Sequence, residues 1–364
     1  MKLLYITNGI SGSGGLERVL SVKASMLAEE FGYEMHVLSL NESGIKPFFP
    51  FSKKIHFHSL EVGGNPVTYL LQYKNGLQKK IDEIKPDIIS VCDDALKGFF
   101  LPGFISTKAK WIHESHASLL LADRGKGVSL FKKAQHGLKQ ILGKRFGKIV
   151  LVTDGNMKEW HLKNLAVIPN PIPFESTQVS SLENKKVMAV GSYSYNKGYD
   201  LLLEIWSKIE QNFPAWELHI YGKGTRDNLH STAKELNLKN IHFHAPVAEI
   251  EKEYLNSSLL VLPSRSEGFG MVLIEAMGFG LPVVSFNCPN GPADIITDGE
   301  DGFLIENGNT EMFAKQASVL MKDDQLRKEM GAKAKKNVQR FSAITIVKQW
   351  NNLFKQLLNK NDDA

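Results

Sequence analysis

Short apolar runs alternate with stretches of helical periodicity along this 364-residue chain, and this alternation constrains the fold more than any other feature. In the first half of the chain the predicted strands are 3–7, 35–40, 87–91, 111–113 and 149–153. In the second half they are 186–191, 217–222, 241–243, 259–262 and 283–286. Strands that are joined through helices pair in parallel rather than as hairpins. The sequence therefore predicts an α/β fold with doubly wound parallel sheets.

A proline-rich segment, 169–173, interrupts the alternation near the middle of the chain, and a polar stretch over 175–183 follows it. This composition is typical of a stiff linker. The chain is also too long for one ordinary hydrophobic core. We therefore expect two domains, residues 1–170 and 185–342, joined by a linker over 171–184.

The two cysteines, Cys92 and Cys288, lie far apart and form no Cys-x-x-Cys pair. This usage favours a reducing compartment and argues against a zinc site, and we expect Cys288 to pack rather than react. The first residues resemble a strand rather than a signal peptide, and no run of about 18 apolar residues is present. We therefore expect a cytoplasmic protein.

The most informative segment is 262–277, which follows an apolar run typical of a buried parallel strand. It predicts a glycine-bearing loop and then a helix, with Glu267 in the loop and Glu275 about two turns into the helix. Unpaired amides at the helix start suit a phosphate. The two carboxylates suit hydroxyl groups, such as those of a sugar and a ribose. A nucleotide-sugar site is one interpretation, and a capped helix with a solvated face is the other.

The string from Ser266 to Val284, SEGFGMVLIEAMGFGLPVV, resembles the signature of family 4 retaining glycosyltransferases, in which seven residues separate two glutamates. The resemblance extends over nearly the whole chain. It implies the GT-B fold: two Rossmann-like, doubly wound domains that face each other across a cleft for a nucleotide-sugar donor. It also implies an acceptor-side first domain, a donor-binding second domain, and a C-terminal helix (343–364) that packs back on the first domain.

The segment 191–200 resembles the Gly-Arg…Lys-Gly segment of that family. Lys197 would then meet the pyrophosphate, whereas Ser192 replaces the usual arginine and leaves the diphosphate one cation short. Either Lys197 and helix amides suffice, or Arg265 substitutes; a merely solvated lysine is the alternative. The turn at Gly222 resembles the Gly-x-Gly turn near the base, which Val247 would line. The resemblance implies a donor-binding set of Gly14, Gly15, Gly191, Lys197, Gly222, Val247, Glu267, Gly268, Phe269, Gly270, Met271, Val272 and Glu275.

A glycine cluster over 9–18 lies between the first predicted strand and helix. The dinucleotide fingerprint Gly-x-Gly-x-x-Gly is broken there, because Glu17 or Ser11 stands where a glycine is required. A nicotinamide dehydrogenase is therefore disfavoured. Gly14 and Gly15 instead resemble the Gly-Gly-x-Glu-Arg loop of the glycosyltransferase family, whose amides approach the donor phosphates or the acceptor. A tight turn before a helix is the plain alternative.

Two histidines follow the predicted strand at 111–113, at a carboxyl end where open α/β sheets place ligands. In the family a histidine in this region touches the transferred sugar, and His116 is our first choice and His113 the second. The pair could also suggest a metal site, but no third ligand is evident in the sequence. The resemblance implies transfer without a metal or a cofactor.

The segment 124–148 carries eight basic residues, with no acidic residue between Asp123 and Asp154. Apolar residues are interleaved, as in a basic amphipathic helix that binds an anionic membrane surface. Nucleic acid is not expected, because no base-stacking motif accompanies the charge. The exposed face of an ordinary helix is an equal alternative. The membrane interpretation would place the protein at the inner face of the cytoplasmic membrane.

Taken together, the resemblance implies retaining, metal-independent transfer of a hexose or N-acetylhexosamine from a nucleoside-diphosphate sugar, with UDP chosen from family frequency. The acceptor would be a glycan or lipid-linked saccharide in synthesis of a cell-surface polysaccharide such as lipopolysaccharide or capsule. The expected catalytic set is Glu267, His116, His113 and Lys197. No nucleophile with a partner base is evident, which favours front-face attack. A GT-B epimerase or phosphorylase, and a catalytically silent sugar-nucleotide-binding protein that docks on membranes, remain as alternatives.

Overall fold

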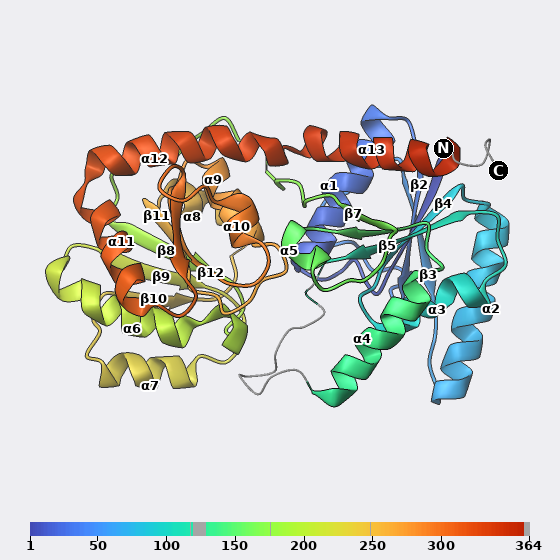
Figure 1. Ribbon diagram of the computed structural model, residues 1–364, viewed down its shortest axis with the longest axis horizontal. Coiled ribbons are helices and arrows are strands. Elements are labelled where there is room, and N and C mark those ends of the chain that lie inside the picture. The colour runs from blue at the N-terminus through green and yellow to red at the C-terminus, as the bar shows by residue number, and fades with distance from the viewer. Residues whose placement is uncertain (117, 119–128, 175, 248, 360–364) are drawn as a thin grey trace. The chain divides into compact units, whose positions relative to one another are not determined.

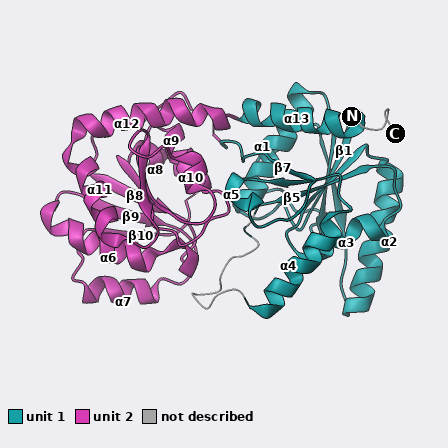
Figure 2. Ribbon diagram, viewed as in Figure 1, with its two compact units in different colours: residues 1–173, 343–364 teal, residues 174–342 magenta. Residues whose placement is uncertain are grey.

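The computed structural model describes residues 1–116, 118, 129–174, 176–247 and 249–359 (Figure 1). The chain forms two compact units (Figure 2). Unit 1 comprises Met1–Pro173 and Ala343–Ala364, and unit 2 comprises Phe174–Ser342. Each unit contains a parallel sheet with helices on both faces, so the doubly wound α/β fold predicted from the alternation is confirmed.

The sheet of unit 1 has seven strands in the order β3-β2-β1-β4-β5-β6-β7. The order reverses between β1 and β4, and open α/β sheets bind ligands beyond the carboxyl ends of the strands at such a point. The strands are β1 (Lys2–Thr7), β2 (Glu34–Leu40), β3 (Ile55–Leu60), β4 (Ile88–Cys92), β5 (Lys110–Ser115), β6 (Lys148–Leu151) and β7 (Leu165–Val167). The helices are α1 (Gly15–Glu30), α2 (Pro66–Ile84), α3 (Leu96–Phe104), α4 (Leu130–Gly143), α5 (Asp154–Met157) and α13 (Ala343–Asn359).

The sheet of unit 2 has six strands in the order β10-β9-β8-β11-β12-β13, with the reversal between β8 and β11. The strands are β8 (Lys186–Val190), β9 (Glu217–Tyr221), β10 (Ile241–His244), β11 (Leu259–Leu262), β12 (Val283–Asn287) and β13 (Gly302–Glu306). The α-helices are α6 (Tyr199–Ile209), α7 (Asp227–Glu235), α8 (Ile250–Leu255), α9 (Met271–Gly278), α10 (Pro292–Ile295), α11 (Thr310–Lys322) and α12 (Asp324–Asn337). Short 3₁₀ turns are η1 (Tyr195–Lys197), η2 (Glu210–Asn212) and η3 (Val338–Phe341).

Three edge strands, β3, β7 and β13, are absent from the sequence-based prediction. Edge strands are buried less than central ones, and their apolar pattern is correspondingly weak. β3 shows the effect, because only its terminal residues Ile55 and Leu60 are buried. The prediction therefore recovered the central strands of both sheets and the edge strand β10, and it missed the other three edge strands.

A buried ion pair links α1 to the sheet of unit 1. The ammonium of Lys23 contacts the carboxylate of Glu114, and both side chains are only 1% exposed. Lys23 Nζ also lies 4.1 Å from the ring centroid of Trp350 on α13, and Ser90 on β4 donates a 2.6 Å hydrogen bond to Glu114. Burial raises the pKa of Glu114, but Lys23 and His116 outweigh it and bring the pKa down to about 2. The pair thus holds α1, α13, β4 and β5 together.

We predict that Glu114→Gln destabilises the protein by about 3–5 kcal/mol at pH 7, because it leaves the charge of Lys23 buried without a counter-charge. Adding Lys23→Met should recover much of this loss. The free energy of unfolding in urea measures both effects, with exposed Glu235→Gln as the control. Since the folded pKa lies below the unfolded value of about 4.3, the contribution of Glu114 is full above that pH and is lost as the pH falls toward 2. Equal stability of wild type and Glu114→Gln at pH 7 would contradict the role of the pair.

Candidate active site

In unit 2 the loops that follow β8, β9 and β11 pack backbone against backbone. A Cβ added to Gly222 would lie 1.8 Å from the carbonyl oxygen of Gly191, and one added to Gly198 would lie 2.1 Å from that of Pro263. Only glycine fits such contacts. Gly191 and Gly222, predicted to bind the donor, therefore have a packing role that places the neighbouring side chains.

This packing brings together Lys197 and Glu267, which lie 70 residues apart in the sequence. Lys197 Nζ lies 2.7 Å from Glu267 Oε1, and Glu267 is almost fully buried. Ser264 donates a 2.5 Å hydrogen bond to the same oxygen. The structure therefore places a buried carboxylate and a partly exposed ammonium side by side next to the start of α9.

Helix α9 begins after Gly270, whose φ is +99°, and Gly268, Met271 and Val272 lie at its start. Phe269 does not face this loop, because its buried ring packs edge-on against Phe341 with a centroid distance of 5.6 Å. Only the backbone of Phe269 is thus available to a ligand. The helix start otherwise has the predicted form of loop followed by helix.

Glu275 lies in the second turn of α9 and is buried. Its Oε2 accepts a 2.8 Å hydrogen bond from the hydroxyl of Tyr254 on α8. The ring of Tyr254 in turn stacks on Phe279, with a centroid distance of 5.6 Å. The hydrogen bond from Tyr254 therefore fixes the orientation of the Glu275 side chain.

Arg265, which sequence analysis suggested as a second cation for the diphosphate, is already paired. Its guanidinium donates two hydrogen bonds, of 2.8 and 2.6 Å, to the carboxylate of Asp200. Asp200 therefore holds the guanidinium of Arg265 in place. Ser192 adds no charge, and its hydroxyl lies 3.2 Å from that of Ser194. Val247 is 39% exposed on the segment after β10.

Cys288 lies behind the Glu267 loop, after β12. The neighbouring Pro289 carbonyl accepts a 3.4 Å hydrogen bond from the amide of Glu267. Burial raises the pKa of Cys288 to about 12, and the charge of Glu267 adds to this shift. The thiol is therefore neutral and packs as part of the loop's support.

In unit 1 the two predicted histidines have different surroundings. His113 is fully buried in the core, where its ring lies 4.2 Å from the ring centroid of Phe99. His116 lies just beyond the end of β5, and its Nε2 is 3.3 Å from Glu114 Oε2. The backbone amide of His116 donates to Asp94, which follows the neighbouring strand β4. The geometry favours His116 as the histidine that a ligand could reach.

Several buried polar atoms near the ends of β4 and β5 have no hydrogen-bond partner among the described residues. They are Asp93 Oδ2, Asp94 Oδ1, His116 Nδ1 and both ring nitrogens of His113. Asp94 Oδ1 and His113 Nε2 lie 3.8 Å apart, which is within ion-pair reach but too long for a hydrogen bond. Unpaired buried polar atoms are rare in native proteins, so their concentration makes this end of the sheet a candidate ligand site.

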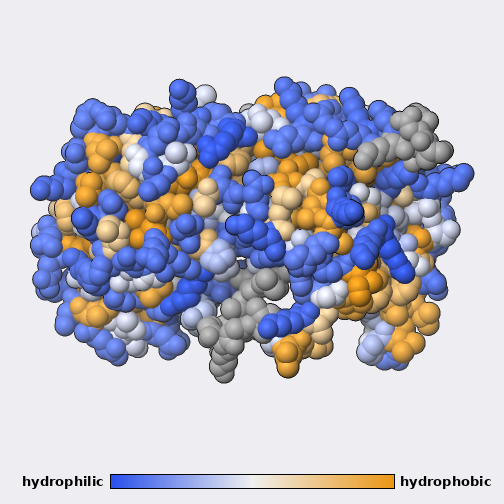
Figure 3. Space-filling model, viewed as in Figure 1, coloured by the Kyte–Doolittle hydropathy of each residue, from blue (hydrophilic) through white to orange (hydrophobic). Residues whose placement is uncertain are grey.

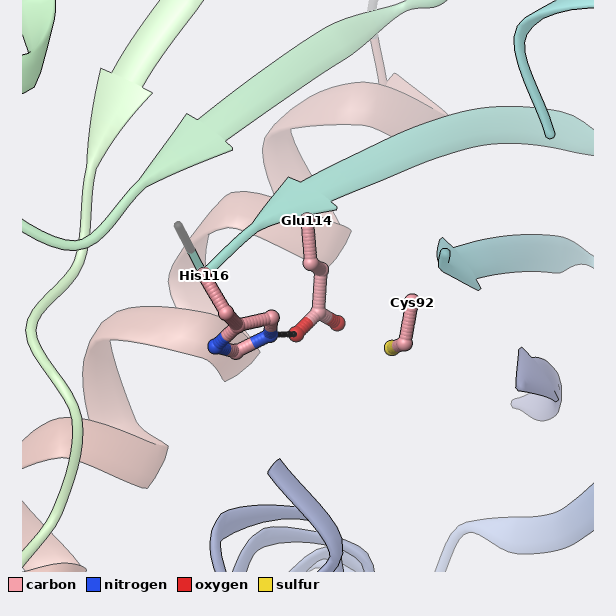
Figure 4. A group of neighbouring side chains, drawn as sticks. All are labelled: Cys92, Glu114 and His116. Atoms are coloured by element: carbon pink, nitrogen blue, oxygen red, sulfur yellow. Dashed lines mark hydrogen bonds and ion pairs between the residues drawn. The ribbon is translucent and has the colours of Figure 1, made fainter. Parts of the chain in front are cut away.

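Cys92, Glu114 and His116 bring three potential metal ligands within 4.8 Å of one another (Figure 4). The sequence had shown no third ligand, so the fold supplies this group. The ammonium of Lys23, however, already neutralises Glu114. Burial also raises the pKa of the Cys92 thiol well above its usual value, which keeps it protonated. In this group the carboxylate of Glu114, whose charge Lys23 compensates, orients His116. A neutral thiol and a compensated carboxylate are poor metal ligands, so the group does not suit a metal ion.

The glycine cluster of unit 1 precedes α1, with Gly14 as the N-cap residue and Gly15 as the first helical residue. The carboxylate of Glu42 accepts hydrogen bonds from the amides of Ile10 (2.7 Å) and Ser11 (3.1 Å). The amides of Ile10 and Ser11 thus bind a carboxylate of the protein itself, and they are not available to a donor phosphate.

Sequence reasoning missed four residues of these two groups: Lys23, Asp94, Tyr254 and Ser264. Only Lys23 carried a usable signal. It lies at helical spacing from Val19, Leu20 and Leu27 on the buried face of α1, where a lysine is out of place unless it is paired.

The family model for "Glycosyl transferases group 1" matches residues 174–337. An uncharacterized glycosyltransferase of Haemophilus influenzae is 30% identical over 366 residues, which cover 96% of this chain and 98% of that protein. The amylovoran biosynthesis glycosyltransferase AmsD of Erwinia amylovora is 29% identical, covering 97% of this chain and 99% of that protein.

Among solved structures, a variant of S. aureus TarM in complex with UDP, α-GlcNAc-glycerol and fondaparinux superposes with a TM-score of 0.80. It is 16% identical and covers 97% of this chain and 99% of that one. At this identity the likeness shows the fold alone, and the fold is GT-B. Because the H. influenzae glycosyltransferase matches at 30% identity over nearly its whole length, this chain belongs to the glycosyltransferases.

Proposed function

We propose that this glycosyltransferase moves a hexose or N-acetylhexosamine from a UDP-sugar to a glycan or lipid-linked saccharide in cell-surface polysaccharide synthesis. Transfer proceeds with retention and without a metal ion. The contact of Lys197 with Glu267 beside the start of α9 carries the proposal. UDP in the TarM complex and amylovoran biosynthesis in the name of AmsD support the choices of nucleotide and pathway class.

In this proposal the positive groups of unit 2 stabilise the departing diphosphate. Cleavage of the bond from the sugar to the diphosphate places negative charge on the leaving oxygen. Lys197 and the amides at the start of α9 are preorganised donors for that charge, each of which contributes about 3–4 kcal/mol to the transition state. Glu267 orients sugar hydroxyls and offsets positive charge on the sugar, and Glu275 accepts hydrogen bonds from the ribose.

The surroundings of Glu267 support front-face attack by the acceptor rather than a covalent intermediate. Its Oε1 already accepts hydrogen bonds from Lys197 and Ser264, which lowers its nucleophilicity. The carboxylate thus serves as an electrostatic and hydrogen-bonding group.

In unit 1, His116 and Asp94 are proposed to contact substrate hydroxyls. Among the described residues, each has a buried polar atom that makes no hydrogen bond, Nδ1 of His116 and Oδ1 of Asp94. Glu114 contacts the other ring nitrogen of His116, Nε2, and so holds the ring in place. A hydroxyl can donate to one such atom and accept from the other, which is the recognition chemistry of a sugar.

We also propose that unit 1 docks on an anionic membrane surface through α4 and α2. On α4, Leu130, Phe131 and Ile141 are 84%, 71% and 65% exposed. The exposed apolar residues of α2 are Val67, Leu70 and Leu71. The N-terminal ends of both helices lie at the lower margin in Figure 1, where Figure 3 shows hydrophobic residues beside hydrophilic ones.

The lysines of the predicted basic segment, 124–148, have two different kinds of surroundings. Lys133 is exposed near Phe131, as membrane binding requires, and Lys132 is half-buried. Lys139 instead turns inward and donates a 2.5 Å hydrogen bond to the carbonyl of Asp94. Residues 124–128 of the segment lie outside the described residues. Within the described part of the chain, no helix is long and apolar enough to span a membrane.

We predict that Lys197→Ala and Glu267→Gln each lower the rate of transfer by about 10²-fold or more, the loss expected for one preorganised transition-state interaction. Glu275→Ala should weaken UDP binding as well. Initial rates with a panel of UDP-sugars, and the rise in melting temperature with UDP, measure the two effects. Lys234→Ala, an exposed lysine on α7, is the matched control. Near wild-type rates in both variants would refute the assignment, and UDP binding without turnover of any sugar would favour a silent binding protein.

The two histidines should respond differently to substitution. We predict that His116→Ala lowers turnover by about 10²-fold with little change in melting temperature, because the side chain contacts substrate rather than the core. His113→Ala should lower the melting temperature, because it removes a ring that packs against Phe99. Comparison of kcat with thermal unfolding for both variants tests this assignment. The reverse pattern would transfer the role to His113.

Replacing Leu130 and Phe131 by serine should reduce binding to vesicles that contain anionic lipid, because the exposed apolar side chains no longer enter the interface. Vesicle co-sedimentation at low and high salt measures the loss. The exposed Met312→Ser in unit 2 is the control. Equal sedimentation of the variant and the wild type would exclude α4 as the docking element.

A further inference from the structure

Each unit carries the same short pattern on two neighbouring strands. In unit 1, Glu34-x-His36 on β2 lies beside Ile55-His-Phe-His58 on β3. In unit 2, Glu217-x-His219 on β9 lies beside Ile241-His-Phe-His244 on β10. The strand register is also the same, because His36 pairs with His56 and His219 pairs with His242. In both sheets the second strand is at the edge.

In unit 2 this pattern brings three ligand atoms together. Glu217 Oε2 lies 2.9 Å from His219 Nε2 and 3.8 Å from His242 Nε2, and the three atoms lie within 4.8 Å of one another. A tetrahedral ion with bonds of about 2.0–2.1 Å needs ligand atoms roughly 3.3–3.4 Å apart. The observed distances lie on both sides of that value, so small rotations of exposed side chains complete the geometry.

The surroundings suit an ion that enters from solvent. His219 is 15% exposed, His242 is 42% exposed and Glu217 is 53% exposed. The other ring nitrogen of His219, Nδ1, lies 2.9 Å from His244 Nε2. A hydrogen bond at the second ring nitrogen is the usual support of a metal-binding histidine. It keeps Nε2 of His219 directed at Glu217.

We propose that Glu217, His219 and His242 form a binding site for a divalent transition-metal ion of the zinc class, with water as the remaining ligand and His244 as the supporting residue. Imidazole and carboxylate ligands favour such ions over magnesium or calcium. The site lies on β9 and β10, and it is separate from the residues assigned to sugar transfer. A bound ion fastens the edge strand β10 to its neighbour.

The corresponding residues of unit 1 do not form such a site, and the cause is a lysine. Lys2 pairs in register with Glu34, and its ammonium lies 3.0 Å from that carboxylate. Lys186 is in the same register with Glu217, but its ammonium contacts Glu253 of α8 at 2.5 Å. The direct contact of Lys186 is therefore with Glu253, and that of Glu217 is with its histidines. Among the described residues of unit 1, no three of these side chains place ligand atoms within 4.8 Å of one another.

The test is metal stoichiometry on chelator-treated, full-length protein without a histidine tag. We expect equilibrium dialysis against Zn²⁺ to give one bound equivalent. We also expect Co²⁺ to give the visible absorption bands of a tetrahedral site. Glu217→Gln and His242→Ala should each abolish the bands, and His244→Ala should weaken Zn²⁺ binding by about 10–100-fold. Glu34→Gln and His56→Ala are matched controls in unit 1 and should bind as wild type does.

Three results would overturn the proposal. One is the lack of a bound equivalent in the wild type. Another is unchanged binding by Glu217→Gln and His242→Ala. The third is binding of two Zn²⁺ equivalents by the wild type, one of which is lost in Glu34→Gln. Zn²⁺ binding would then depend on the shared residue pattern rather than on the geometry of unit 2. None of these readouts depends on transferase activity, so failure of this proposal and failure of the proposed function are distinguishable.

Discussion

The close contact of loop backbones at the carboxyl ends of β8, β9 and β11 is the constraint on which the site in unit 2 depends. Parallel strands deliver all their following loops to one edge of the sheet. Gly222 and Gly198 then let these loops touch without side chains between them. Because of this contact, Lys197 from one loop reaches Glu267 in another. The charge pair is therefore a product of backbone packing.

Charge compensation has the corresponding role in unit 1. Glu114 is buried, and burial alone would favour its protonated form. Lys23 keeps it ionised, so its carboxylate can hold the ring of His116. The same ammonium makes the nearby group of Cys92, Glu114 and His116 unsuitable for a metal. Buried Lys23 thus fixes the orientation of His116 through Glu114, and it also makes metal binding at this group unfavourable.

Much of the candidate site in unit 2 was predictable because it is local in sequence. Glu267, Gly270 and Glu275 belong to one segment of strand, loop and helix, and local periodicity identifies all three elements. For two other residues, the prediction from residue type and motif was wrong about where the side chain lies. Phe269 and His113 belong to motifs but turn into the core, and the direction of a side chain near a strand end depends on the surrounding packing. Ser264 and Tyr254 had no signal, because serine and tyrosine are common and their partners are distant or ambiguous.

By itself the sequence determined the alternation of strands and helices, the parallel sheets and the main site motif, because each follows from local periodicity and short-range steric preferences. Tertiary structure decided which distant side chains meet. Unit 1 and unit 2 carry the same Glu-x-His and Ile-His-Phe-His pattern, yet Lys2 pairs with Glu34 whereas Lys186 pairs with Glu253. That difference arises from the position of helix α8, which no local pattern specifies. Electrostatic partners are chosen by distance in space, and only the folded chain sets those distances.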